Sequence, residues 1–147
     1  MEIFMSENNF WHQLRNGIYH KGHFSRIESH ATSNGFPDID FCTLGISGQI
    51  ELKYTNSMTA PEIRPSQVRW FKKRTKHDGN AWLFVKVEVD KTFYLLIPQD
   101  RVVEVASQSH IMDWFKYSIH IWEGQMNWDD FLDTIRTYQL WGRTPSP

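Results

Sequence analysis

The chain has 147 residues, of which 40% are hydrophobic and 22% are charged, and its formal net charge at pH 7 is -1. This length and composition predict a single folded domain over residues 1–147 and exclude a disordered chain. The one cysteine excludes an internal disulfide, and no apolar run is long enough to span a membrane, so we expect a cytoplasmic protein without a membrane partner. A net charge near zero argues mildly against a nucleic-acid partner, unless the basic residues gather on one surface.

The first predicted element is a short helix over residues 6–16. Ser6 is a candidate N-cap, and Gly17 follows the expected end of the helix. Glu7 lies in the first turn of this helix, where we expect its carboxylate to complement the helix dipole.

A strand predicted over residues 49–54 carries an unusual polar face. Gln49, Glu51 and Lys53 share that face, while hydrophobic residues alternate with them on the other. An acid and a base two residues apart on a half-buried strand are costly unless each has a partner or a metal ion. We therefore assign the hydrophobic face to the core and expect chemistry on the polar one.

A second strand with carboxylates precedes this one. Asp38 and Asp40 alternate with apolar residues, and the short, glycine-bearing loop 44–48 predicts a hairpin between the two strands. A register shift of one residue would move every side chain to the opposite face, so the register decides whether Asp38 or Asp40 lies beside Glu51. The sequence leaves both arrangements open.

The residue types on these strands favour a hard divalent cation. Oxygen ligands from Asp and Glu, with no cysteine or histidine cluster nearby, suit Mg²⁺ or Mn²⁺ better than zinc. Such an ion supports phosphodiester hydrolysis, in which a nearby lysine orients the nucleophile or stabilises the developing charge. Lys53 is placed for that role.

Three motifs, taken in order, resemble the PD-(D/E)XK nuclease superfamily. They are Gly-x-Pro-Asp at 35–38, Glu-x-Lys at 51–53, and Gln67 on the helix that follows Arg64-Pro65-Ser66. Within the superfamily the order is similar to that of the VRR-NUC branch and of small phage endonucleases. The matching stretch, the motif core, covers about residues 26–87.

The resemblance implies a role for each matching residue. Asp38 and Glu51, with the backbone carbonyl of Leu52, would hold the metal ion. Lys53 would act on the attacking water, and Gln67 would support the site from its helix.

A further acid is less firmly placed by the resemblance. Many members carry their first carboxylate on an amino-terminal helix, so Glu7 is a rival of Glu28 for this position. Glu28 lies in a stretch that fits a short strand or loop, and we include it among the candidate catalytic and metal-binding residues, as a ligand of a second ion. Whether one or two ions bind, and whether Asp40 or Glu28 joins the site, stays open.

The helix predicted from Pro65 to about Lys76 combines a site residue with a basic surface. Gln67 borders the apolar stripe that faces the sheet. The exposed side carries the densest basic patch of the chain, and a histidine lies in the loop before the first motif; these candidate nucleic-acid-binding residues are Arg69, Lys72, Lys73, Lys76 and His30. Contact with backbone phosphates is one interpretation, and a solvated helix face is the other.

The second half of the chain predicts two more strands and a cover for the sheet. Residues 81–89 and 92–97 alternate like strands, with a two-residue turn at 90–91. Residues 101–106 fit either a strand or a short helix. We expect the aromatic-rich segment 109–141 to be a helical cover, some of whose aromatic residues could serve a dimer surface or stack on unpaired bases.

Together these observations predict an α/β fold similar to that of the restriction endonucleases, with a mixed central sheet of four or five strands flanked by helices. The expected function is a Mg²⁺- or Mn²⁺-dependent DNA endonuclease; a virus-encoded enzyme of this kind would work in the host cytoplasm. Three alternatives stay open: a Holliday-junction resolvase that acts on branched DNA as a homodimer, a nucleic-acid-binding module without catalysis, and a purely structural set of salt bridges. Single-stranded DNA and RNA also stay open as substrates.

Overall fold

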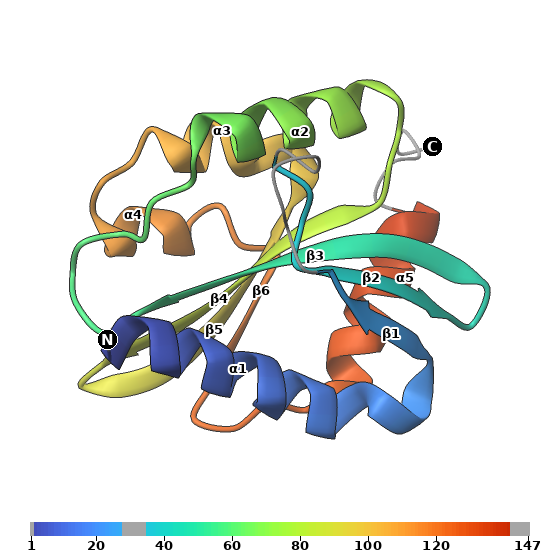
Figure 1. The fold of residues 1–147 in the computed structure, drawn as a ribbon, viewed down its shortest axis with the longest axis horizontal. Coiled ribbons are helices and arrows are strands. Elements are labelled where there is room, and N and C mark those ends of the chain that lie inside the picture. Colours follow the sequence, from blue (N-terminus) through green and yellow to red (C-terminus); the bar gives the residue numbers. More distant parts are fainter. Residues whose placement is uncertain (1, 28–34, 142–147) are drawn as a thin grey trace.

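The computed structural model describes residues 2–27 and 35–141, which form a mixed sheet with helices on both faces (Figure 1). The described strands are β1 (His23–Arg26), β2 (Ile39–Thr43), β3 (Ile46–Thr55), β4 (Ala81–Val89), β5 (Lys91–Pro98) and β6 (His120–Glu123). The helices are α1 (Glu2–Ile18), α2 (Pro65–Lys76), α3 (Val102–Ala106), α4 (Ile111–Phe115) and α5 (Trp128–Trp141), with short 3-10 segments η1 (Tyr19–Lys21) and η2 (Gln99–Arg101). No described helix has both the length and the apolar character that a membrane crossing requires.

The six described strands lie in the sheet in the same order as in the chain. Neighbours run antiparallel except β3 and β4, which are parallel because α2 carries the chain back across the sheet between them. In the hairpin of β2 and β3, the two turn residues Leu44 and Gly45 have positive φ values of 50° and 79°. A two-residue turn of this conformation matches the twist of the paired strands and is tighter than the loop we expected at 44–48.

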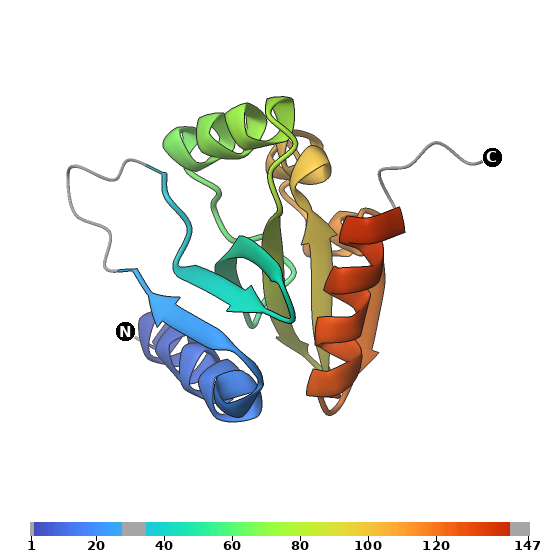
Figure 2. The ribbon, with the colours of Figure 1, turned by 90° about the vertical axis from the view of Figure 1, so that its right-hand side faces the viewer.

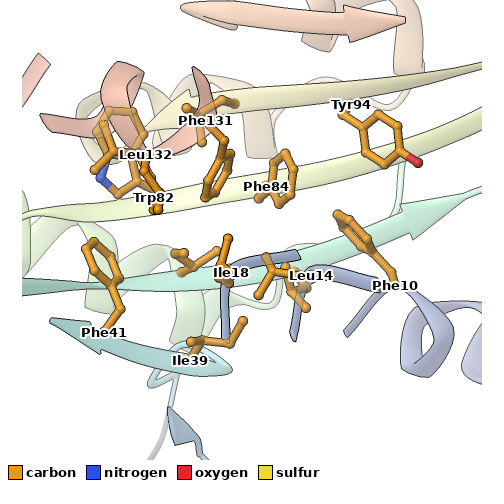
Figure 3. Close-up of a cluster of buried hydrophobic side chains, with 14 of the residues drawn as sticks. Phe10, Leu14, Ile18, Ile39, Phe41, Trp82, Phe84, Tyr94, Phe131 and Leu132 are labelled. Carbon is orange, nitrogen blue, oxygen red and sulfur yellow. The ribbon is translucent and has the colours of Figure 1, made fainter. Parts of the chain in front are cut away.

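Two hydrophobic layers enclose the sheet. Helices α1 and α5 cover one face, and α2, α3 and α4 cover the other (Figures 1 and 2). Alternation along β4 supplies both layers, since Trp82 and Phe84 point to α1 and α5 while Leu83 and Val85 point to the other three helices. Figure 3 shows Phe84 within the first layer, close to Phe131 of α5, whose ring centroid lies 4.7 Å away.

The predicted α/β class, with a mixed sheet between helices, is confirmed, but the strand count of four or five was too low. The two strands that the sequence did not reveal are β1 and β6, which have four residues each. Strands this short show too few alternations to be separated from loop sequence. As a result, the segment 109–141 is not a purely helical cover, because β6 lies within it between α4 and α5.

Several boundaries also differ from the expectations. Residues 101–106 are helical, and the helix predicted from Pro65 to Lys76 is confirmed. Helix α1 begins at Glu2 rather than at Ser6 and continues through Gly17. A Cβ at Gly17 would lie 2.2 Å from the indole of Trp128, so this glycine is required by close packing against the start of α5 rather than by a helix end.

Candidate active site

The register of the β2–β3 hairpin places Asp38 beside Glu51. Ile39 pairs with Ile50 and Asp40 with Gln49, so one more step along the register brings Asp38 opposite Glu51. The backbone N–H of Leu52 donates a hydrogen bond of 2.9 Å to Oδ2 of Asp38. The alternative with Asp40 is therefore excluded: Asp40 instead accepts a 3.1 Å hydrogen bond from Nε2 of Gln49.

The first motif directs Asp38 through a close contact with α2. Gly35 has a φ of +77°, and a Cβ there would lie 2.1 Å from the carbonyl oxygen of Ser66. A side chain is thus excluded both by the backbone conformation and by the available space. Phe36 packs against Trp70 of α2, with ring centroids 5.3 Å apart. These two contacts place the segment before β2 against the helix and hold Asp38 immediately before the start of β2.

Glu51 is a buried carboxylate, 3% exposed, and it contacts Gln67 and Lys53 in addition to Asp38. Its Oε2 accepts a 2.7 Å hydrogen bond from Nε2 of Gln67 and lies 3.4 Å from Nζ of Lys53. The oxygen of the Gln67 amide accepts from Lys53 Nζ at 3.1 Å and from the Arg64 backbone N–H at 2.9 Å. The first turn of α2 therefore fixes Gln67, and Gln67 in turn fixes the relative position of the acid and the base.

The electrostatics of the two carboxyl groups favour a bound cation. Burial, and then the negative charge of Asp38, raise the pKa of Glu51 from 4.5 to about 8, while Lys53 opposes the shift. Burial also raises the pKa of Asp38, against the lowering effects of the Leu52 N–H and of Lys53. Because two adjacent buried carboxylates repel each other, the pair retains a proton near neutral pH unless a cation compensates the charge.

A third acid, Glu7, approaches the pair from α1. Burial and the charge of Asp38 raise its pKa, whereas the positive charge of Lys53 lowers it. Since α1 begins at Glu2, Glu7 lies beyond the first turn, and the expected role at the helix dipole is wrong. The sequence does contain a signal that Glu7 faces inward. It precedes the buried Phe10 by three residues and Leu14 by seven, and this helical spacing places it on the buried stripe of α1.

The donor set fits Mg²⁺ or Mn²⁺. Within the described part of the chain, no group of three His, Cys, Asp or Glu side chains is arranged to hold a metal ion. Mg²⁺ commonly uses only one or two protein carboxylates and completes its octahedron with waters and substrate oxygens. The pair of Asp38 and Glu51 meets that requirement. The role of the Leu52 carbonyl stays a prediction.

The predicted nucleic-acid-binding residues fall into two groups. Four of them lie exposed on α2: Arg69, Lys72, Lys73 and Lys76. His30, like the candidate metal ligand Glu28, lies outside the described residues, so both assignments stay predictions. Arg74 also lies on α2, but the sequence did not predict it as a binding residue. Its guanidinium lies 4.4 Å from the centroid of the Trp70 ring.

Comparisons with known proteins give no family for this chain. No protein-family model matches it, and a search of the curated proteins finds no match. The similarity to PD-(D/E)XK nucleases therefore depends on the three motifs alone.

Proposed function

We propose that this protein is a Mg²⁺- or Mn²⁺-dependent endonuclease that hydrolyses phosphodiester bonds in DNA, on a fold of the restriction-endonuclease type. The observation that carries the proposal is the buried carboxyl pair of Asp38 and Glu51, with Lys53 within 3.4 Å of Glu51. An acid pair can hold a divalent ion, and a basic group beside it can orient the nucleophile or stabilise developing charge, which together support phosphodiester hydrolysis.

The carboxylates of Asp38 and Glu51 are the proposed protein ligands. A divalent ion bound there would polarise a phosphoryl oxygen and acidify a water for in-line attack on phosphorus. Glu7 adds negative charge on the side of Asp38, where it would strengthen cation binding or hold a second ion. Asp40 is engaged with Gln49 and receives no role.

Lys53 is the proposed group that positions the attacking water or stabilises the developing charge. Its side chain is 11% exposed, and its Nζ contacts both Gln67 and Glu51. From this position the ammonium group can orient a water, or stabilise the charge that develops on the phosphoryl oxygens. Gln67 is a positioning residue, because it touches Glu51 and Lys53 and holds both at fixed distances.

The charge balance argues against a purely structural network. Burial and the charge of Asp38 raise the pKa of both Glu7 and Glu51, and burial raises the pKa of Asp38. These increases remain in spite of nearby positive charge: Lys53 acts on all three acids, Arg26 on Glu7 and Asp38, and Arg64 on Glu7. Lys53 is the only base in direct contact with the acids among the described ion pairs and hydrogen bonds. A structural salt bridge gains stability from matched charges, whereas an excess of buried acid raises pKa values and lowers stability. Such an excess is what a cation site requires before the cation binds.

The experiment that tests the proposal measures cleavage of labelled DNAs with Mg²⁺ or Mn²⁺, over a panel that runs from single strands to duplexes and four-way junctions. Wild type is compared with Lys53→Ala, and Lys116→Ala serves as the control because Lys116 pairs with Asp113 on the surface of α4. We expect wild type and Lys116→Ala to cut and Lys53→Ala to be inactive. Cleavage by Lys53→Ala at the wild-type rate would contradict the assignment.

A further inference from the structure

One flank of α2 forms a hollow that the proposed catalysis does not use. It is lined by Trp70, Lys73, Arg74, His77 and Gly79 and has a volume of about 350 Å³. Trp70, Lys73 and Arg74 recur at a spacing of three and four, so their side chains share one side of α2, and His77 and Gly79 follow at its C-terminal end. Trp70 contacts Phe36, which precedes Asp38 by two residues, so the hollow lies beside the segment that leads to Asp38.

Arg74 is held rigidly at the hollow. Its guanidinium covers the face of Trp70 at 4.4 Å, and the edges of Phe36 and Phe71 pack against the same indole at 5.3 Å each. A Cβ at Gly79 would lie 2.3 Å from the Arg74 side chain, so only glycine leaves room for this arrangement. With that face of Trp70 covered, the hollow offers a fixed cation rather than a stacking platform for a base.

The cations at the hollow form no ion pair with another described residue. None of the ion pairs among the described residues involves Lys73 or Arg74, nor the exposed cations of the same helix. Surface lysines elsewhere do have partners, as Lys91 has Glu123 and Lys116 has Asp113. Like charges within one helix destabilise it slightly, so an unpaired group of this density indicates an anionic ligand.

We propose that this hollow binds a backbone phosphate of the nucleic-acid substrate, away from the phosphate that is cut. This inference rests on the proposed nuclease function. Arg74 follows Gln67 by seven residues, which is about 10 Å along a helix axis. A phosphate held at Arg74 is therefore displaced from the cut by about 10 Å along α2, a span of a few nucleotides of one strand. The substrate class is therefore a polynucleotide that extends past the cut, and not a free nucleotide or a terminal dinucleotide.

The first test measures binding without cleavage. Affinity for a labelled duplex is measured in metal-free buffer over a range of salt concentrations, for wild type, Arg74→Ala, Lys73→Ala and the control Arg136→Ala, whose side chain is exposed on α5 across the sheet. We expect Arg74→Ala to weaken binding about tenfold and to reduce the slope of log K against log salt by about 0.9. Lys73→Ala, which alters only an exposed side chain, should shift both values in the same direction. If both variants match Arg136→Ala, the phosphate site is wrong.

The second test combines the variants with shortened substrates. Wild type should lose cleavage rate when fewer than about three nucleotides remain on one side of the cut, and Arg74→Ala should be insensitive to that shortening. If wild type cuts no substrate but the salt slopes change as expected, the phosphate site stands and the nuclease function fails. If wild type cuts and Arg74→Ala responds to shortening as wild type does, the function stands and the phosphate site fails.

Discussion

Strands β3 and β4 are parallel neighbours beneath the same layer of helices, yet they present opposite chemistry to it. Glu51 is in register with Leu83, and Lys53 with Val85. Leu83 and Val85 are fully buried in the hydrophobic layer of α2, α3 and α4, as that environment favours. The fold therefore accepts hydrophobic residues at these positions on β4. Under the proposed function, β3 carries its charged pair at the equivalent positions for catalysis rather than for stability.

Making β3 resemble β4 should produce the largest effect. We expect the double variant Glu51→Leu/Lys53→Val to lose DNA cleavage by at least about a thousandfold, because it removes both a proposed metal ligand and the proposed catalytic lysine. Replacement of a buried charged pair by hydrophobic residues is commonly neutral or stabilising by about 1–4 kcal/mol. Cleavage rates and denaturant unfolding of the same preparation check both parts. A destabilised variant would show that the charges hold the fold together.

The converse change on β4 should affect stability alone. Leu83→Ala removes a buried side chain from the hydrophobic layer and should lower the free energy of unfolding by about 2–5 kcal/mol. Below the unfolding transition, we expect the folded variant to cut DNA at a rate near that of wild type. A selective loss of cleavage in folded protein would mean that β4 takes part in the chemistry.

The stability of the metal-free protein should fall as the pH rises. The pKa of Glu51 is about 8 in the folded chain, compared with an ordinary value of 4.5. The carboxyl group therefore binds its proton more tightly in the folded state than in the unfolded state. The contribution of this proton to the free energy of unfolding is fully present below pH 4.5 and is lost as the pH rises through about 8. For one proton, the free energy of unfolding falls by no more than about 1.4 kcal/mol per pH unit. Thermal unfolding measured between these values checks it, and Glu51→Gln should flatten the profile. An equally steep profile in Glu51→Gln would place the titration elsewhere.

Gln67 should influence catalysis more than its distance from the reacting atoms suggests. Gln67→Ala frees both Glu51 and Lys53 from their hydrogen-bonded positions, and we expect kcat to fall about 10- to 100-fold. The control is Gln13→Ala, which removes a glutamine that bonds Lys86 and Tyr94 in the opposite layer. Equal loss of kcat in both variants would reduce Gln67 to a general packing role.

Glu7 should give the smallest of these effects. Glu7→Gln removes a negative charge near Asp38, so the Mn²⁺ affinity should fall by less than about tenfold. Glu104→Gln, at an exposed position of α3, is the matched control and should bind Mn²⁺ as wild type does. If Glu7→Gln also binds as wild type, Glu7 is not part of the cation site.

The parts of the site that could be predicted from the sequence are those governed by local rules. Strand alternation put Glu51 and Lys53 on one face, and helical spacing put Gln67 toward the sheet. The choice of Asp38 over Asp40 depends on the hairpin register, which follows from a turn at Leu44 and Gly45 that is tighter than the sequence suggested.

The parts that could not be predicted depend on packing between distant segments. Glu7 reaches the site only because α1 packs against β3, and the starting point of its helix was placed four residues too late. The position of Arg74 at the hollow depends on Gly79, which follows α2 in the chain and leaves room for its side chain. It also depends on Phe36, which precedes α2 and packs against Trp70. Such contacts leave no periodic pattern in the sequence.

The measurement that most directly tests the central claim is a calorimetric titration of wild type and Glu51→Gln with Mn²⁺ at neutral pH, in buffers of different ionisation enthalpy. Because the carboxyl pair retains a proton before the ion binds, we expect wild type to bind Mn²⁺ and to release a proton, which makes the observed heat depend on the buffer. Glu51→Gln should bind far more weakly and without that dependence. Mn²⁺ binding that is absent in wild type, or unchanged in Glu51→Gln, would contradict the assignment of Asp38 and Glu51 as a metal site.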